Sequence, residues 1–324
     1  MYYLLDENTR RAHKLRNRLH SLLLLIGIGG VLGVSAILIW GWAGLVWALL
    51  AVGILVVLAP RVPPEAVMRM YQAREVDLRF AGRVGRVIEI LAERAGLAKT
   101  PRLYVVPSST LNAFATGSAE NASIAVTAGL LQTLSLRELA GVLAHEMSHI
   151  RNNDLWLMGL ADAMSRFTQA LSTLAVMLAA FNVMGMLVGV EFISWWPILV
   201  LYLAPLVSSL LQLGLSRARE YDADLEGVLL TGDPEGLISA LAKLERYTGR
   251  FWEDLMFPVP GRRVPQPSIL RSHPRTEDRI ARLRELAPQP KRPPIVVVDE
   301  PFDMASPWGD MLRRPRVRWP GVWY

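Results

Sequence analysis

Two long apolar blocks limit what this chain can fold into more than any other feature of its sequence. They cover about residues 21–59 and 167–215. A helix that is apolar all round over such a length has no suitable place in a soluble core, whereas a membrane-spanning helix needs about 20 apolar residues. The chain of 324 residues has a mean hydropathy of +0.28, and only 20% of its residues are charged. The sequence therefore predicts an integral membrane protein rather than a purely soluble enzyme.

Each block is long enough for two spans joined by a short turn. In the first block, the break at 40–44 predicts helices at about 21–39 and 44–60. The second block predicts helices at about 167–190 and 193–215. A cleaved signal peptide is the alternative for the first span, although the apolar stretch is longer than a signal core and a second span follows at once. The expected architecture is a mostly α integral membrane protein with four transmembrane helices in two hairpins.

Basic residues flank the outer ends of both hairpins and are absent from both short turns. Under the positive-inside rule, this distribution places both termini and residues 60–155 in the cytoplasm. It also accounts for the formal net charge of +6, so that nucleic-acid binding is not expected. The basic residues concerned are Arg10, Arg11, Lys14, Arg16, Arg18, Arg61, Arg69, Arg74, Arg151, Arg217 and Arg219.

The residues that several reaction classes need are missing from this sequence. The chain has no cysteine, which excludes disulfides, thiolate metal sites and cysteine nucleophiles. It also contains no G-x-x-x-x-G-K motif for an intrinsic ATPase motor and no G-x-S-x-G motif for a serine hydrolase of the elbow type.

Outside the two blocks, the pattern predicts a cytoplasmic α+β domain with a small β-sheet. Residues 61–74 are expected to form a linker, and 74–96 a helix. Ser135 and Glu138 predict a helix over 136–151 that begins with a capping box. Strands are expected at 103–106, 113–116 and 123–127, and further helices from the second block to about 230 and over 234–247.

The helix predicted over 136–151 carries the H-E-x-x-H pattern, with His145, Glu146 and His149. At 100° per residue the two histidines lie about 40° apart on one face, so both rings can reach one metal ion. Glu146 lies beside them, where a carboxylate can take a proton from an activated water molecule. The alternative is a pair of surface histidines.

A zinc site of this kind needs a third protein ligand and one open position. Glu220 and Asp224 are four residues apart on the helix that leaves the last span, so they share a face. Glu220 is the candidate ligand, and Asp224 can accept the N–H of a ligating imidazole and fix its tautomer. A solvated acidic helix face is the alternative for this segment alone, but the histidine pair favours a metal site.

Four segments together carry a family resemblance. They are 112–117 (NAFATG), 144–150 (AHEMSHI), 216–224 (SRAREYDAD) and 272–274 (SHP). In order, in spacing and in the apolar hairpin between the two metal motifs, the chain resembles the HtpX-like membrane metallopeptidases. These are gluzincins related to prenyl-protein and mitochondrial quality-control peptidases. The resemblance covers about residues 20–285.

The resemblance implies a gluzincin-type peptidase domain with one Zn²⁺ ion. His145, His149 and Glu220 would bind this ion, and Glu146 would be the general base. Asp224 would orient one of the histidine ligands.

The resemblance also implies residues that handle the substrate. His273 would be a late histidine that stabilises the oxyanion or positions the substrate, with a helix-capping role before Pro274 as the alternative. Arg217 is expected to hold local structure by pairing with acids, with a direct catalytic role as the alternative. An extended substrate would add as a strand to an edge formed by Asn112, Ala113, Phe114 and Ala115.

The expected domain organisation alternates membrane and cytoplasmic segments. The tail is expected to be poorly ordered, with contact to anionic lipid and docking on the domain as alternatives. In chain order the segments are a basic N-terminus (1–20), the first hairpin (21–60), a first catalytic part (61–155), the second hairpin (156–215), a second catalytic part (216–286) and a Pro-rich basic tail (287–324).

The residues and the resemblance together predict a membrane-embedded, zinc-dependent endopeptidase of the cell inner membrane. It would cut misfolded membrane proteins or their cytoplasmic segments, as in protein quality control and the stress response. The expected partners are membrane-protein or unfolded polypeptide substrates and the lipid bilayer, and the oligomeric state is open. The alternatives are a non-catalytic membrane scaffold with a structural metal site, against which Glu146 argues, and a transporter, against which the few polar residues of the second block argue.

Overall fold

The computed structural model describes residues 7–58, 63–187, 189, 193–255, 276–286, 293–295, 317–318 and 322–323. The chain forms two compact units, which we call the sheet unit and the helical unit. The sheet unit contains Met1–Glu7, Val62–Leu155 and Arg219–Tyr324, and the helical unit contains Asn8–Arg61 and Trp156–Ala218. The chain therefore leaves the sheet unit after Leu155 and returns to it at Arg219.

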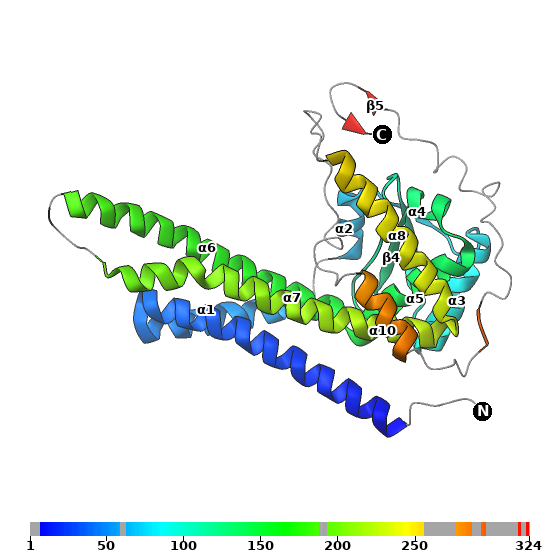
Figure 1. Ribbon diagram of the computed structural model, residues 1–324, viewed down its shortest axis with the longest axis horizontal. Helices are drawn as coiled ribbons and strands as arrows, with labels where there is room; N and C mark the ends of the chain where they lie inside the picture. The colour runs from blue at the N-terminus through cyan, green and yellow to red at the C-terminus, as the bar shows by residue number, and fades with distance from the viewer. Residues whose placement is uncertain are drawn as a thin grey trace. The chain divides into compact units, whose positions relative to one another are not determined.

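The helical unit consists of α1 (Glu7–Leu58) and the longer parts of α6 (Asp154–Leu187) and α7 (Trp195–Thr231), drawn in blue and green in Figure 1. Three helices of the described chain are long and apolar enough to cross a membrane, namely α6, α7 and the Ser21–Ile54 part of α1. Large apolar side chains such as Trp47 are exposed along them, as expected of surfaces that face lipid.

Helix α1 reverses direction in its middle. Trp40 (φ −129°, ψ 15°) and Gly41 (φ 61°, ψ −148°) have non-helical backbone angles. A Cβ atom placed on Gly33 would lie 3.2 Å from a methyl carbon of Leu45, although a continuous helix would separate these residues by about 18 Å. Glycine alone adopts the angles of Gly41 without strain. The predicted break at 40–44 is therefore confirmed as a turn between two helical arms.

The sheet unit contains a four-stranded sheet in the order β1-β2-β4-β3. Strand β1 (Arg74–Val76) is antiparallel to β2 (Arg102–Val106), which is parallel to β4 (Ser123–Thr127). Strand β3 (Ala113–Thr116) is antiparallel to β4. The three predicted strands are confirmed, and β3 lies at an edge of the sheet.

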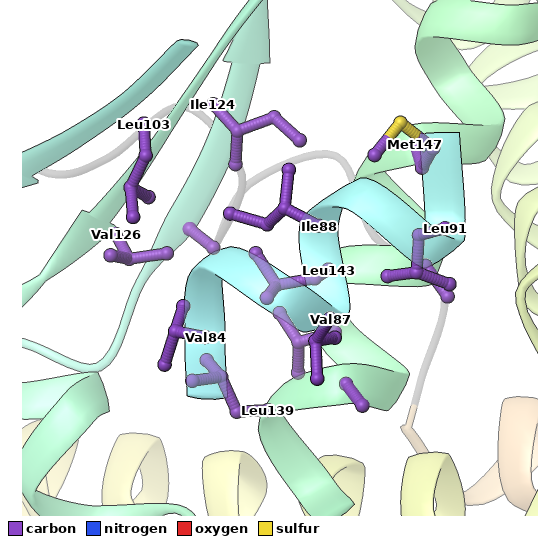
Figure 2. Packing of buried hydrophobic residues seen from close by; sticks show 14 of the residues in the cluster. Val84, Val87, Ile88, Leu91, Leu103, Ile124, Val126, Leu139, Leu143 and Met147 are labelled. Carbon is purple, nitrogen blue, oxygen red and sulfur yellow. The ribbon is translucent and has the colours of Figure 1, made fainter. Parts of the chain in front are cut away.

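Helices α3 (Gly82–Ala95) and α5 (Leu136–Asn152) pack on one face of this sheet and bury the main hydrophobic core. Leu103 and Ile124 are register partners on β2 and β4, and both point toward Ile88 of α3 (Figure 2). All three side chains are fully buried. The remaining core residues labelled in Figure 2 are Val84, Val87, Leu91, Val126, Leu139, Leu143 and Met147.

A second, smaller apolar cluster contains Met68 of α2 (Pro64–Met70) together with Tyr104 and Val106 of β2. Further along the chain, α8 (Pro234–Leu255) packs against α5 (Figure 1).

The remaining helices and strands are short. They are α4 (Ala128–Thr133), α10 (Thr276–Leu286), which packs against α8, and the paired strands β5 (Val317–Arg318) and β6 (Val322–Trp323).

The predicted helix over 74–96 is wrong at its start. Arg74–Val76 forms β1, and α3 begins only at Gly82. The register pairs Val76 with Leu103, so backbone hydrogen bonds to a distant strand outweigh the local helical periodicity. The predicted linker over 61–74 is also wrong in part, because it contains α2 and Arg74, the first residue of β1.

The start of the predicted tail is docked on the sheet unit. The Ile295 N–H donates to the Thr231 carbonyl oxygen over 3.0 Å, and Arg94 Nη2 donates to the Pro293 carbonyl oxygen over 3.1 Å. Ile295 also packs against the main core. The expectation of poor order is therefore wrong for 293–295, while most of the tail lies outside the described residues.

Candidate active site

Helix α5 holds the two histidines of the H-E-x-x-H pattern on one face. It begins with the predicted capping box, in which the Ser135 side chain accepts from the Glu138 N–H and the Glu138 carboxylate accepts from the Ser135 N–H. The Nε2 atoms of His145 and His149 lie 3.2 Å apart, and their rings meet edge to face. Both side chains are largely buried, so the alternative of two surface histidines is wrong.

Helix α7 brings Glu220 to the same point. Its Oε2 atom lies 3.4 Å from His145 Nε2, and its Oε1 atom lies 3.6 Å from His149 Nε2. Two ligand atoms on a tetrahedral zinc ion, each bound at 2.0–2.2 Å, would be about 3.3–3.6 Å apart. The side chains of these three residues therefore fit a single zinc ion.

The second nitrogen of each imidazole contacts a buried aspartate. His145 Nδ1 lies 3.0 Å from Asp224 Oδ1, and His149 Nδ1 lies 3.0 Å from Asp154 Oδ2. Ionised carboxylates only accept hydrogen bonds, so each Nδ1 carries the proton and each Nε2 is left with a lone pair. Both lone pairs therefore belong to the two nitrogens that converge beside Glu220, as a metal site requires.

Two arginines hold these aspartates. Arg279 of α10 donates from Nε to Asp224 Oδ2 over 2.7 Å and from Nη2 to Asp224 Oδ1 over 2.5 Å. Arg219 donates from Nη1 to Asp154 Oδ1 over 3.3 Å. Arg217, the residue for which the sequence suggested pairing with acids, is exposed.

The buried charges of this cluster match one divalent cation. Histidines that bind a metal are neutral, so four carboxylates and two guanidinium groups leave two negative charges. Burying such an excess without a partner costs several kcal/mol. The six charged groups, all buried, are those of Glu146, Asp154, Glu220, Asp224, Arg219 and Arg279.

The same acids act on the imidazoles electrostatically. Burial alone would lower the pKa of His149, but the hydrogen bonds to Asp154 and Glu220 raise this pKa well above its usual range. For His145, burial alone would likewise lower the pKa, but the Asp224 and Glu220 carboxylates raise this pKa above its usual value. The site therefore favours a positive charge between these rings, which a metal ion supplies.

Glu146 is buried next to the first histidine. Its charge contributes to raising the pKa values of both His149 and Arg279. A carboxylate in this position can accept a proton from a water molecule in the cluster.

The edge strand β3 contacts α5, and within the described residues it pairs only with β4. Ala113 and Ala115 are buried, whereas Asn112 and Phe114 are partly exposed. The predicted site residue His273 lies outside the described residues.

Three residues of the cluster were missed by the sequence reasoning: Asp154, Arg219 and Arg279. Asp154 had one local signal, because it directly follows the pair Asn152 and Asn153 that ends α5. Arg219 lies in the 216–224 segment, but no local signal pairs either arginine with its aspartate, because these contacts join residues that are 65 and 55 positions apart.

Comparisons with known proteins identify the family of this chain. The profile of peptidase family M48 matches residues 79–287. A protease HtpX homolog from Desulfatibacillum aliphaticivorans is 34% identical over 284 residues, which cover 84% of this chain and 91% of the relative. Another, from Ralstonia nicotianae, is 36% identical over 275 residues, which cover 82% and 92%.

Among solved structures, Ste24p from S. mikatae matches with a TM-score of 0.43 and 20% identity, covering 84% of this chain and 66% of that one. That likeness is too distant to bear on the site. The family profile spans both histidines and Glu220, and the relatives match over most of their length. The chain therefore belongs to peptidase family M48 and is a zinc-dependent metallopeptidase of the membrane.

Proposed function

We propose that this metallopeptidase is an endopeptidase of protein quality control, which cuts misfolded membrane proteins or their cytoplasmic segments. The observation that carries the proposal is the convergence of His145, His149 and Glu220 beside the buried Glu146. Glu220 follows the predicted end of the last span by only five residues of one continuous helix. The chain would therefore run from the proposed last span directly into the segment that carries this ligand.

In this proposal, His145, His149 and Glu220 hold the zinc ion, and Asp224 orients His145. A bound zinc ion would polarise the scissile carbonyl and make water more acidic. Glu146 accepts the proton of the attacking water and returns it to the leaving amine. His273 would contact the substrate or the developing oxyanion.

The substrate would bind as an added strand along β3. The free edge of this strand in the described part of the chain and its contact with α5 support this mode. Hydrogen bonds to a peptide backbone give affinity with little dependence on sequence, which suits an enzyme that removes diverse misfolded chains.

We also propose four membrane spans, with both termini and both catalytic parts in the cytoplasm. The reversal of α1 at Trp40 and Gly41 supports two arms in place of one long span. The basic residues that flank the hairpins support the orientation. The domain boundaries would follow the segments expected from the sequence, with the catalytic parts at 61–155 and 216–286.

The experiment that tests the enzymatic assignment uses the full chain purified in detergent and casein as an unfolded substrate. Chelation should abolish cleavage, and added zinc should restore it. Glu146→Gln should retain zinc but lower the rate by about 10²–10⁴-fold, because only the base is removed.

The matched control is Glu93→Gln, since Glu93 is an exposed glutamate of α3. It should cleave casein at the rate of the unchanged protein. A Glu146→Gln enzyme with full zinc and an undiminished rate would contradict the assignment of the base.

A further inference from the structure

We propose that Asp154 and Arg219 are positioning residues of the zinc site, which fix His149 through one buried chain of contacts. Asp154 would set the tautomer and orientation of His149, and Arg219 would hold Asp154 in place. The inference rests on the ligand roles proposed above for His149 and Glu220.

The contacts form a continuous series. One carboxylate oxygen of Asp154 accepts a hydrogen bond from His149 Nδ1 over 3.0 Å, and the other accepts one from Arg219 Nη1 over 3.3 Å. The relative exposure of Asp154 is 1% and that of Arg219 is 7%. Because water has little access to these groups, the ion pair is not screened and the carboxylate cannot turn away without losing both partners.

The backbone places Asp154 for this contact. In a continuous helix, a residue five positions after His149 would lie about 140° around the axis and could not reach its ring. Asn153 breaks the helix with a left-handed conformation (φ 58°, ψ 30°) and caps α5. The next helix, α6, begins at Asp154, and with the helix interrupted at Asn153 the Asp154 carboxylate reaches Nδ1.

The pair also joins the two places where the chain leaves and re-enters the sheet unit. Asp154 lies just before the exit after Leu155, and Arg219 is the first residue after the return. Arg219 is followed directly by the ligand Glu220. A single contact between residues 65 positions apart therefore links the second histidine ligand to the segment that carries the third ligand.

A comparable arrangement surrounds the other histidine, where Arg279 holds Asp224 and Asp224 contacts His145. Loss of an outer carboxylate partner typically lowers metal affinity by about 10–100-fold. Loss of an ion pair that has only a structural role would lower stability and leave zinc affinity unchanged. Zinc affinity therefore separates the two roles.

The test measures zinc affinity of the full chain in detergent by competition with a chromogenic chelator. Asp154→Ala should lower the affinity about 10–100-fold, and Asp154→Asn should lower it less, because the amide oxygen can still accept from Nδ1. Arg219→Met should lower it, and Arg219→Lys should restore part of the loss.

The matched control is Asp233→Asn. It removes another arginine–aspartate pair of the sheet unit, in which Arg137 Nη2 lies 2.8 Å from Asp233 Oδ1. This variant should bind zinc as tightly as the unchanged protein. The proposal is overturned if Asp154→Ala, or Asp154→Asn should the alanine variant not fold, lowers zinc affinity no more than this control.

A His149→Ala variant distinguishes this failure from a failure of the proposed function. If His149→Ala weakens zinc binding and the Asp154 variants do not, the positioning role is wrong while the ligand assignment stands. If His149→Ala has no effect either, the ligand assignment itself is wrong.

Discussion

At the scale of single residues, each ligand histidine is held between two carboxylates. His145 lies between Asp224 and Glu220, and His149 lies between Asp154 and Glu220. Glu220 is the only one of these acids whose oxygens face both Nε2 atoms. In the proposed zinc site its charge would therefore act on the metal directly, whereas the aspartates would act through the imidazole rings.

Loss of a hydrogen-bond partner outside the ligand set typically weakens metal binding about 10–100-fold. We expect Glu220→Gln to weaken zinc binding by more than this. The variant removes an anionic ligand and halves the negative excess of the cluster. Zinc content after equilibration with a chelator measures the effect. Glu235→Gln, an acid in the first turn of α8, is the control. Equal zinc contents in the two variants would mean that the third ligand is another residue.

At the scale of elements, α5 carries the histidines and is fixed at its start by Glu138. This carboxylate accepts from the Ser135 N–H over 2.9 Å, from Lys243 Nζ over 2.7 Å and from Ser239 Oγ over 2.6 Å. Glu138 therefore contributes both to the cap of α5 and to its contact with α8.

Glu138→Gln should lower the stability of the sheet unit by about 1–2 kcal/mol near pH 7. Burial alone would raise the pKa of Glu138, but the hydrogen bonds from Lys243, Ser239 and the Ser135 N–H lower this pKa below its usual value. A carboxyl with a lowered pKa in the folded state stabilises it above the unfolded pKa of about 4.3, and this stabilisation is lost as the pH falls.

Thermal unfolding of both proteins between pH 3 and 7 checks this sign. The difference in midpoint between the unchanged protein and Glu138→Gln should shrink below about pH 4. Glu245→Gln, on an exposed position of α8, should show no such difference. A gap that widens in acid would refute the assignment.

The turn of α1 takes its backbone conformation from Gly41, and Gly44 allows the close approach of the second arm to the Ala36 carbonyl oxygen. Gly41→Ala should lower stability by about 1–3 kcal/mol, because an alanine side chain is strained at φ 61° and ψ −148°. Gly53→Ala provides the same substitution in the helical second arm, where a Cβ atom has open space. It should leave stability unchanged or raise it by up to about 1 kcal/mol. Thermal unfolding in detergent compares the two, and equal losses would argue against a glycine-specific turn.

At the scale of the whole molecule, the peptidase site is assembled from segments on both sides of an apolar hairpin. The histidines precede the exit of the chain at Leu155, and Glu220 follows its return at Arg219. Zinc would therefore bind only when both flanking segments are folded together.

The proposed topology predicts the sidedness of reporter fusions. Fusions near residue 65, near residue 130 and at the C-terminus should report the cytoplasm, because basic residues flank these segments. Fusions near residues 42 and 191 should report the opposite side. A fusion near residue 130 that reports the outside would contradict both the orientation and a cytoplasmic active site.

The sequence by itself determined the features that depend on local spacing. The apolar blocks, the turn at Gly41, the capping box of α5 and the pairing of His145 with His149 each follow from residues within a few positions of one another. Hydrophobic periodicity, cap residues and the spacing of the H-E-x-x-H motif are all local signals of this kind. Glu220 and Asp224 could be predicted as well, because they lie four residues apart on one helix face and the histidine pair calls for an acidic ligand.

Only the tertiary structure decided the features that join distant segments. Arg74–Val76 forms a strand because β2 offers it hydrogen bonds, which no helical periodicity can indicate. Asp154 is a partner of His149 because one left-handed residue, Asn153, interrupts the helix between them. Arg219 and Arg279 reached their aspartates across 65 and 55 positions. A buried carboxylate takes whichever cation the fold brings to it, so the identity of that cation is set by packing and not by local sequence.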